Sequence, residues 1–353
     1  MSTKFLNAPP AGQPALTSAL YSLRASTESP KVEVEIVRDP LGANDLLFST
    51  ALYPHDGIVE LTDIGSIIEE RFRVTARCWD TVTIRFEDAS VTFIAVYCEY
   101  EMPPEFDVTE CFLSASLRSV VHRNSAISIT HWANESVEYQ AWFVGLNHSG
   151  ETTVVQRTLT RAENSDYLAF AVNDIIDLVL GDSDDSLASV SYFGISQGSL
   201  QKIFWLLEHP FFLTFGFRNI FNAYEYIDVT GIVTRKTNVS RESAICGGRV
   251  RQYNQTVERT FEVQTGPLTE NQVRELEQLI SSREIHLCCA GRDYDVIITD
   301  HTLESDNDDS ALTSIKFTFR FATERPVLTS DDIDTLMPAR HRIFTQEFTI
   351  QFV

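Results

Sequence analysis

The stretch TVTIRFEDASVTFIAVY, residues 81–97, decides the fold class. Apolar side chains stand at every second position on both sides of a polar turn at 87–90: Val82, Ile84 and Phe86 before it, and Val91, Phe93 and Tyr97 after it. Alternation of this kind places the apolar side chains on one face of a strand, and two such runs around a short turn predict a β-hairpin. The chain is therefore predicted to be mainly antiparallel β-structure.

The same pattern continues on either side of this hairpin. KVEVEIV at 31–37 predicts another half-buried strand, and further strands are expected at 110–116, 126–131 and 137–144. Asp63 is in position to cap a short helix through Ile67 and Ile68. Residues 31–150 are thus predicted to form one antiparallel β-sandwich. Residues 1–30 contain Pro9, Pro10, Pro14 and Pro30 and predict an extended N-terminal arm that needs a partner to become ordered.

The second half predicts an α+β arrangement. Residues 151–210 are interpreted as a mixed connecting region, in which LAFAVNDIIDLVL at 168–180 fits either a buried helix or a strand. Residues 211–326 run strand, strand, strand, helix, strand, strand, with the helix at 270–282 opened by a capping box of Thr269 and Gln272. Residues 327–353 are predicted to be a linker and an apolar terminal edge strand. The predicted fold class is mainly β with an α+β element: antiparallel β-sandwich domains, one carrying a packed α-helix.

Charge and composition limit the partners. The chain has 28 basic and 50 acidic residues, a net charge of −22, which repels phosphate backbones and anionic lipid. No 18-residue apolar run and no continuous apolar leader are present, so we expect no specific nucleic-acid binding, no membrane insertion, and synthesis and retention in the cytosol until assembly. The six cysteines form no CxxC pair and are expected to be buried free thiols.

One catalytic motif needs weighing. Gly194-Ile195-Ser196-Gln197-Gly198 matches the G-x-S-x-G elbow of serine hydrolases, with SVSYF as a candidate strand before it and SLQKIFWLLEHP as a candidate helix after it. The acid and base would come from Asp295, Asp300, His286, His301 or His341. The antiparallel-looking strands after Pro210 and the missing oxyanion loop favour a structural turn instead. We therefore predict no catalytic residues and no enzyme, and keep a serine hydrolase using Ser196 as an alternative.

Other polar motifs predict no metal or cofactor site. The acidic loops at 181–186 and 304–310 resemble the start of a calcium loop but lack its glycine and distant glutamate, so solvated loops are expected. Gly247-Gly248, before Arg249 and Arg251, has no phosphate-binding lysine and predicts a turn. The four tryptophans, Trp79, Trp132, Trp142 and Trp205, are interpreted as core residues. A host-surface or glycan-binding module is the second alternative function.

Residues 211–325 carry a resemblance to a known class. The segment FRNIFN at 217–222, QTGPLT at 264–269 before the helix, ITD at 298–300 and FTFR at 317–320 resemble tail proteins of tailed bacteriophages or prophages of the Bacteroidetes type. The resemblance implies a structural virion protein of the tail or baseplate, assembled in the bacterial host cytoplasm as a homo-oligomeric ring or tube component beside other tail or baseplate proteins. It assigns no catalytic residue.

Overall fold

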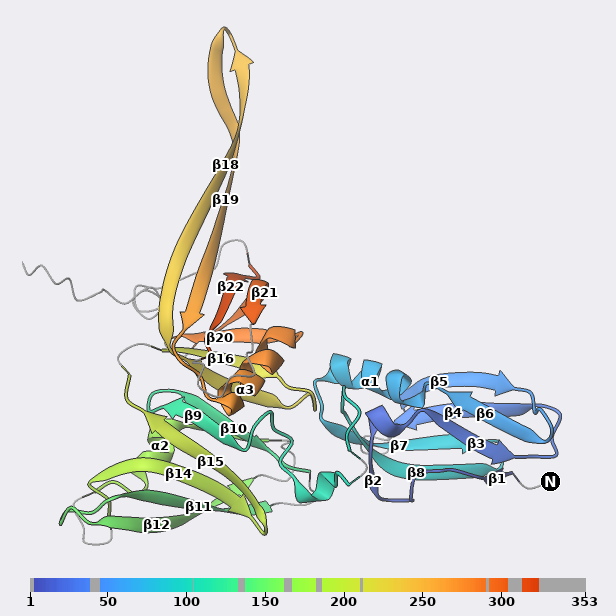
Figure 1. The fold of residues 1–353 in the computed structure, drawn as a ribbon. Helices are drawn as coiled ribbons and strands as arrows, with labels where there is room; N and C mark the ends of the chain where they lie inside the picture. Colours follow the sequence, from blue (N-terminus) through green and yellow to red (C-terminus); the bar gives the residue numbers. More distant parts are fainter. Residues whose placement is uncertain are drawn as a thin grey trace, which may run out of the picture. The chain divides into compact units, whose positions relative to one another are not determined.

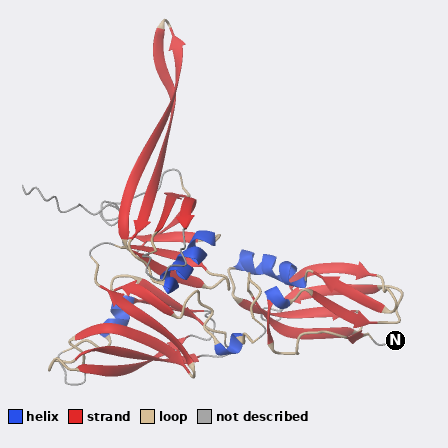
Figure 2. Ribbon diagram, in the orientation of Figure 1, coloured by secondary structure: helices blue, strands red, loops and turns tan. Residues whose placement is uncertain are grey.

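The computed structural model describes residues 3–38, 45–103, 105–132, 137–161, 167–181, 186–209, 212–289, 292–303 and 313–323. Most of these residues lie in antiparallel β-strands, with three α-helices among them (Figure 2). The predicted mainly β class is therefore confirmed.

The first β-sandwich packs two sheets, in the strand orders β1-β3-β6 and β2-β8-β7-β4-β5 (Figure 1). Its strands are β1 Lys4–Phe5, β2 Pro14–Leu16, β3 Ser22–Ser26, β4 Val32–Arg38, β5 Asp45–Leu52, β6 Ile58–Thr62, β7 Trp79–Phe86 and β8 Ala89–Val96. The two sheets share one apolar core with helix α1, Ile64–Thr75. Strands β7 and β8 pair from Trp79↔Val96 to Phe86↔Ala89, which confirms the predicted hairpin.

The predicted extended N-terminal arm is wrong for the described residues. Strand β1 pairs with β3, β3 pairs with β6, and β2 adds to the edge of the second sheet beside β8. Leu23 and Ala25 are buried in the core, so this segment has the apolar side chains it needs to join the sandwich. Pro14 is tolerated because it opens an edge strand, where a missing backbone donor costs little.

A second β-sandwich follows along the chain. Its sheets have the orders β12-β11-β14-β15-β9 and β10-β13. The elements are β9 Arg118–His122, β10 Ala126–Thr130, β11 Val137–Leu146, β12 Thr152–Arg161, β13 Tyr167–Ala171, α2 Val172–Asp177, β14 Ser189–Gln197 and β15 Leu200–Leu207. They surround a core that contains Tyr139, Phe143, Phe193 and Phe204.

This second sandwich overturns three predictions. The expected boundary at residue 150 falls between β11 and β12, which are paired neighbours, so residues 31–150 are not one sandwich and 151–210 are not a connection. The strand expected at 110–116 is absent: a 3-10 turn at Val108–Glu110 is followed by bends and irregular backbone up to β9. Alternation marks each strand but does not reveal which sheet the strand joins, and this is why the boundary was misplaced. The ambiguous run 168–180 contains both a strand, β13, and a helix, α2.

The third sheet has seven strands in the order β17-β16-β20-β21-β22-β19-β18. Its elements are β16 Leu213–Arg218, β17 Tyr224–Val229, β18 Gly231–Cys246, β19 Arg249–Thr265, α3 Glu270–Ser281, β20 Ile285–Cys289, β21 Arg292–Leu303 and β22 Ile315–Phe321. The predicted helix is confirmed, but the predicted order of three strands, helix and two strands is incomplete: the run 224–235 is divided between β17 and β18, and β20 stands between the helix and the two strands expected after it. The capping box forms: the Gln272 backbone N donates to Thr269 Oγ1, and the Thr269 backbone N donates to Gln272 Oε1. The predicted C-terminal linker and strand at 327–353 lie outside the described residues.

The chain divides into two compact units. Unit 1 comprises Met1–Leu207, Phe217–Tyr226 and Arg274–Arg283, and so holds both β-sandwiches. Unit 2 comprises Glu208–Gly216, Ile227–Val273 and Glu284–Val353, and holds the long β18–β19 hairpin.

Candidate assembly surface

The most exposed ordered feature is the hairpin of β18 and β19 (Figure 1). Its strands pair from Gly231↔Thr265 to Cys246↔Arg249, and the free side of β19 pairs with β22 only at Phe261–Gln264. Beyond that point the described residues give the hairpin no other sheet partner, and every side chain from 234 to 259 is exposed. A strand of this length extends roughly 50 Å. The hairpin is therefore a two-stranded ribbon with both backbone edges open.

Local sequence explains how the ribbon forms. Gly247 and Gly248 have φ of 60° and 76°, the left-handed conformation that a two-residue turn between twisted strands requires. The expected turn at this glycine pair is confirmed. Strands were expected only up to Arg235 and again from Arg259, so the intervening strand residues were missed. The signal was present, because a Gly-Gly pair flanked by alternating residues such as Val239, Ile245 and Val250 is a recognised hairpin pattern.

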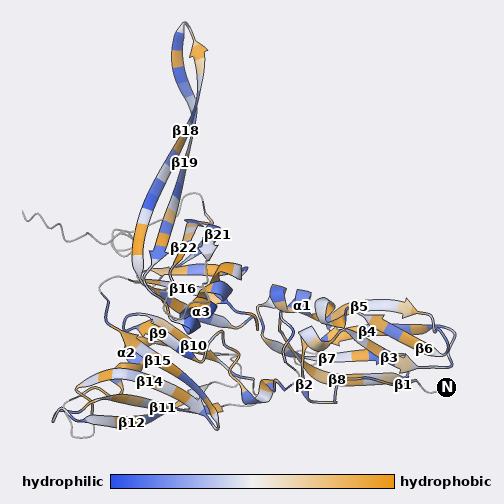
Figure 3. Ribbon diagram, in the orientation of Figure 1, coloured by the Kyte–Doolittle hydropathy of each residue, from blue (hydrophilic) through white to orange (hydrophobic). Residues whose placement is uncertain are grey.

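The two faces of the ribbon differ in chemistry. We name the two faces after the residue numbers of β18. The odd face contains Arg235, Thr237, Val239, Arg241, Ser243 and Ile245 of β18 and the residues of β19 on the same side, which are Arg259, Val257, Gln255, Gln252 and Val250. Directly opposed residues share a face, so Val239 meets Val257 and Ile245 meets Val250 there, with arginines between the apolar pairs. The opposite, even face carries mostly Thr, Ser, Asn and Glu. Figure 3 shows the resulting alternation of hydrophobic and hydrophilic residues along both strands.

The odd face is continuous with a buried core at its base. Val233 opposes Val263 on the same side, and both Val263 and Phe261 are buried. Phe261 stacks on Phe319 of β22, with ring centroids 5.1 Å apart. The same face thus changes from core to exposed surface along one ribbon, with Val239, Val257, Ile245 and Val250 between 41% and 76% exposed. Because these apolar pairs continue the face of a buried core, this face is a candidate contact surface.

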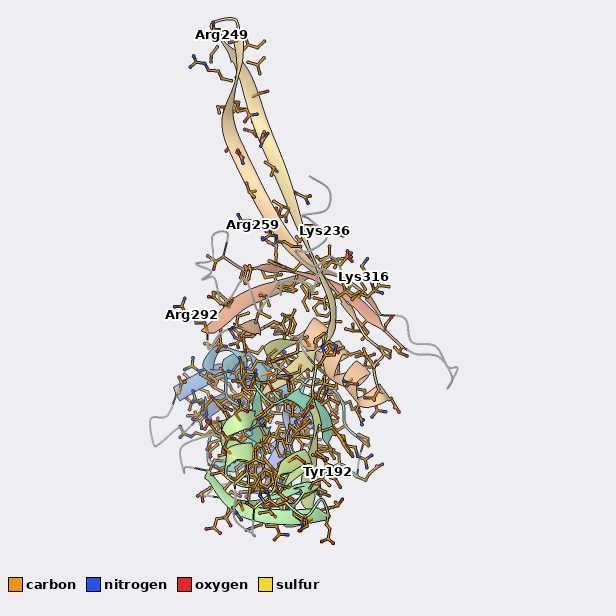
Figure 4. All side chains as sticks on the ribbon, turned by 90° about the vertical axis from the view of Figure 1, so that its left-hand side faces the viewer. Tyr192, Lys236, Arg249, Arg259, Arg292 and Lys316 are labelled. Carbon is orange, nitrogen blue, oxygen red and sulfur yellow. The ribbon has the colours of Figure 1, made fainter. Side chains whose placement is uncertain are left out.

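The ribbon carries charge opposite to that of the rest of the chain. Residues 231–260 hold six basic side chains, Arg235, Lys236, Arg241, Arg249, Arg251 and Arg259, against two acidic ones, Glu242 and Glu258. Its net charge is +4 in a chain of −22. Figure 4 shows Arg249 near the outer end, with Lys236 and Arg259 closer to the base. Lys236 is paired at the base with Glu262 over 2.5 Å, whereas the odd face has three arginines and no acidic residue.

A second exposed surface lies on the outer face of the β11–β14–β15 sheet in unit 1. Tyr192 contacts both Trp142 and Trp205, with centroid distances of 5.9 and 4.5 Å, and Trp205 is 48% exposed. A Cβ on Gly194 would lie 2.2 Å from the Trp142 ring, so glycine lets the indole lie flat over β14. Trp79 is a core residue as predicted, but Trp205 is not, because its register places it opposite Tyr192 on the solvent face.

Ser196 does not stand on a nucleophile elbow. It lies near the end of β14, and Gln197 pairs with Leu200 across a turn in which Gly198 has φ of 58°. The candidate helix that the hydrolase alternative needs after the motif does not form: residues 200–207 are β15, whose alternating Leu200, Lys202 and Phe204 are buried. The Ser196 hydroxyl donates to the Gln140 backbone oxygen at 3.2 Å. The motif is a strand-turn-strand hairpin, as the structural interpretation predicted.

The proposed acid and base residues are only partly brought together. His286 of β20 contacts Asp295 of β21 at 2.7 Å and Glu284 at 3.1 Å. Asp300 and His301 lie farther along β21. All of these belong to unit 2 and Ser196 belongs to unit 1. His341 lies outside the described residues.

Glu225 of unit 1 is a buried carboxylate that accepts four hydrogen bonds. Its carboxylate accepts from Lys202 Nζ at 2.7 Å, the Ala115 backbone N at 2.7 Å and Asn219 Nδ2 at 2.8 Å, and from the Ser114 hydroxyl. Burial raises the pKa of Glu225, but the Lys202 charge and these hydrogen bonds outweigh burial and hold the pKa below its usual value. Lys202 also donates to Ser114 Oγ at 2.5 Å. Because the lysine is committed to a carboxylate, the cluster is a structural clamp on the 113–115 loop.

The cysteines and the potential metal ligands do not form a second candidate site among the described residues. The described cysteines are free thiols, but Cys246 is exposed near the hairpin turn, so the expectation that all are buried is wrong there. Burial raises the pKa of Cys111 to about 12. Within the described ranges, His, Cys, Asp and Glu form no group able to hold a metal, and no helix is long and apolar enough to cross a membrane. The acidic loops at 181–186 and 304–310, which are expected to be solvated, lie mostly or wholly outside those ranges.

No protein-family model and no curated protein matches the chain. Among solved structures, the calcium binding domain CBD12 of CALX1.1 is similar at 11% identity over 56% of this chain and 79% of that one, with a TM-score of 0.19. CBD12 from CALX1.2 is similar at 12% identity over 55% and 79%, again with a TM-score of 0.19. Similarity at this level carries no argument about function.

Proposed function

We propose that the protein is a structural virion protein of a phage tail or a related injection apparatus, and that it works by assembling as a homo-oligomeric ring or tube component. The observation that carries the proposal is the β18–β19 ribbon, whose residues 234–259 are exposed on both faces. An isolated two-stranded ribbon is only marginally stable in water, and open strand edges invite pairing with other chains. A neighbouring copy that covered the ribbon would remove both problems.

The charge distribution supports self-association. A positive ribbon on a chain of −22 is attracted to another copy of the same chain. Because the ribbon is one surface and its acceptor another, the contact is heterologous, and repeated heterologous contacts close into rings or extend into tubes. The negative remainder would prevent nucleic acid from adhering to such a conduit.

Assembly is tested by measuring mass. Mass photometry and negative-stain imaging of the full chain should give a closed multimer. A variant in which Thr237 and Arg259 are joined by an Asn-Gly turn should stay folded, by circular dichroism, and should be monomeric. If the full chain is a monomer at all attainable concentrations, the proposal fails.

The virion assignment has its own test. Sequencing the genes beside this one should reveal tail genes, including a long tape-measure-like neighbour. Purified particles from the same source should contain the protein by mass spectrometry. A neighbourhood of metabolic genes and particles that lack the protein would rule the assignment out.

A glycan- or host-surface-binding role is a second candidate, favoured by the Trp142–Tyr192–Trp205 surface. Exposed aromatic rings can stack on the apolar faces of sugars. Gly194 leaves room for the Trp142 indole, which meets Tyr192 edge to face at 86°, and Trp205 is the most exposed of the three rings. A glycan array should show binding that is lost in Tyr192→Ala/Trp205→Ala and kept in Tyr253→Ala, which removes an exposed aromatic from the hairpin. Equal binding by both variants, or no binding by the parent chain, would reject this role.

A further inference from the structure

The odd face of the hairpin has the composition of a docking surface with a defined charge preference. Arg235, Arg241 and Arg259 are its charged residues, and no carboxylate opposes them on that face. The even face, by contrast, mixes Lys236, Arg249 and Arg251 with Glu242 and Glu258. Apolar pairs flanked by arginines are typical of interface centres, in which arginine is enriched and lysine depleted. The ribbon therefore presents one face suited to an acidic, partly apolar partner.

Unit 1 contains an exposed segment of matching character, which we call the acidic segment: residues 99–103 and 105–110. It contains five carboxylates and no lysine or arginine: Glu99, Glu101, Glu105, Asp107 and Glu110. The side chain of Glu99 is 31% exposed, accepts from the Tyr97 hydroxyl at 2.6 Å and lies 3.9 Å from Arg283. The other four acidic residues are exposed, as is Tyr100 at 54%. The segment thus offers negative charge and an exposed aromatic ring together.

Residues 106–109 of the acidic segment are anchored to unit 1 and to one another. The Phe106 ring stacks on Phe221 at 6.0 Å, and Val108 is buried. Asp107 accepts hydrogen bonds from the Thr109 hydroxyl at 2.7 Å and backbone N at 2.8 Å, which lower the pKa of its carboxyl. A surface that is already ordered loses less entropy on binding than a mobile loop.

We propose that the odd face of the hairpin docks on the acidic segment of a second copy of this chain. The inference rests on the proposed self-association and names both surfaces of its contact. Arginines of one copy meet carboxylates of the next, and the Val239–Val257 and Ile245–Val250 pairs are covered in the same step. Each copy then uses its own ribbon in one direction and its own acidic segment in the other.

The test reverses the charges on each proposed surface separately and then on both surfaces together. Arg241→Glu/Arg259→Glu reverses two charges on the odd face, whereas Arg249→Glu/Arg251→Glu makes the same change in net charge on the even face. The first variant should weaken self-association at least about tenfold at 0.15 M salt, and the second should change it much less. Glu105→Lys/Glu110→Lys should weaken it as the first does. A chain with Arg241→Glu, Arg259→Glu, Glu105→Lys and Glu110→Lys should recover assembly, because both sides are reversed.

The outcomes separate this inference from the proposed function. If the full chain assembles but the two hairpin variants behave alike, or the four-site variant is not rescued, the docking inference is wrong and self-association stands. If no multimer forms at all, the proposed function fails first. Binding of a labelled duplex DNA that depends equally on both arginine pairs, with assembly unaffected, would overturn the docking inference in favour of nucleic acid. A change confined to the unfolding temperature of a monomer would overturn it in favour of a contact within one chain.

Discussion

Lys202 and Glu225 show how one buried charge pair can hold together segments distant in sequence. Their side chains are 4% and 7% exposed, and Glu225 also accepts from Ser114, Ala115 and Asn219. Removing two charges from water is expensive, so such a pair adds little net stability while intact. Its importance lies in what happens when one partner is removed.

Lys202→Met should destabilise unit 1 by about 3 kcal/mol or more, because it leaves the Glu225 carboxylate buried without its counter-charge. Urea unfolding monitored by tryptophan fluorescence measures the loss. Adding Glu225→Gln to the variant should restore part of the stability. A single variant as stable as the parent would show that the carboxylate is solvated or neutral.

Glu225 also predicts a pH dependence. Its folded-state pKa is lowered, so it contributes stability above the unfolded value of about 4.3, and this contribution is lost as the pH falls through the folded pKa. The free energy of unfolding should therefore fall with acidification below about pH 4.5 more steeply in the parent than in Lys202→Met/Glu225→Gln. If the free energy of unfolding fell equally steeply in both proteins from pH 5 to pH 3, the lowered pKa of Glu225 would be contradicted.

At the scale of elements, the stability of the hairpin is expected to be more sensitive to substitution at its base, at Gly231, than at its turn, at Gly247. Gly231 has φ of 142°, and a Cβ there would lie 2.1 Å from the Gln264 backbone oxygen. Gly231→Ala should cost about 2 kcal/mol or more, because neither the strained φ nor the facing backbone can relax easily. Gly247→Asn is the matched change at a glycine of φ 60° with open space around it, and should stay within about 0.5 kcal/mol of the parent. Thermal unfolding of both variants compares them, and equal losses would refute the argument.

The N-terminus of α3 gives a second test at this scale. Thr269 and Gln272 hydrogen bond to each other's backbone N. Thr269→Ala should cost about 1 kcal/mol, while Thr269→Ser should keep the cap and most of the stability. Chemical denaturation distinguishes them. If serine is as damaging as alanine, the capping box is not what stabilises this end of the helix.

For the whole molecule, assembly should change the protection of the hairpin more than that of any sandwich core. Its amides at 234–259 pair only across the ribbon among described residues, so in the monomer they should exchange rapidly with deuterium. At concentrations at which the multimer forms, exchange there should slow sharply. Core strands such as β7, which is paired on both sides, should change little and serve as the internal control. If the hairpin amides exchanged as rapidly in the multimer as in the monomer, assembly would use another surface.

Much of the fold could be predicted because it follows from local periodicity. Alternation in 81–97, in 31–37 and at Ile315, Phe317, Phe319 and Phe321 identified strands and their buried faces, and the Thr269–Gln272 spacing located the helix start. The run after Ser196 was a candidate helix only under the serine hydrolase alternative, and its period of two, with Leu200, Lys202 and Phe204 buried, agrees with the strand β15 that forms there. For the candidate site, the glycine pair and the flanking arginines were visible in the sequence, but a turn alone does not show that two strands extend beyond their sheet.

What the sequence by itself determined is the β class, the identity of most strands, the α3 helix and the strong negative charge, because each depends on neighbouring residues or on composition. Tertiary structure alone decided that residues 3–30 join a sandwich, that two cores replace the single one expected before residue 150, and that β18 and β19 run past β22 into solvent. Those features depend on which strands pair across long separations, and pairing is set by the packing of whole sheets, which no local pattern contains.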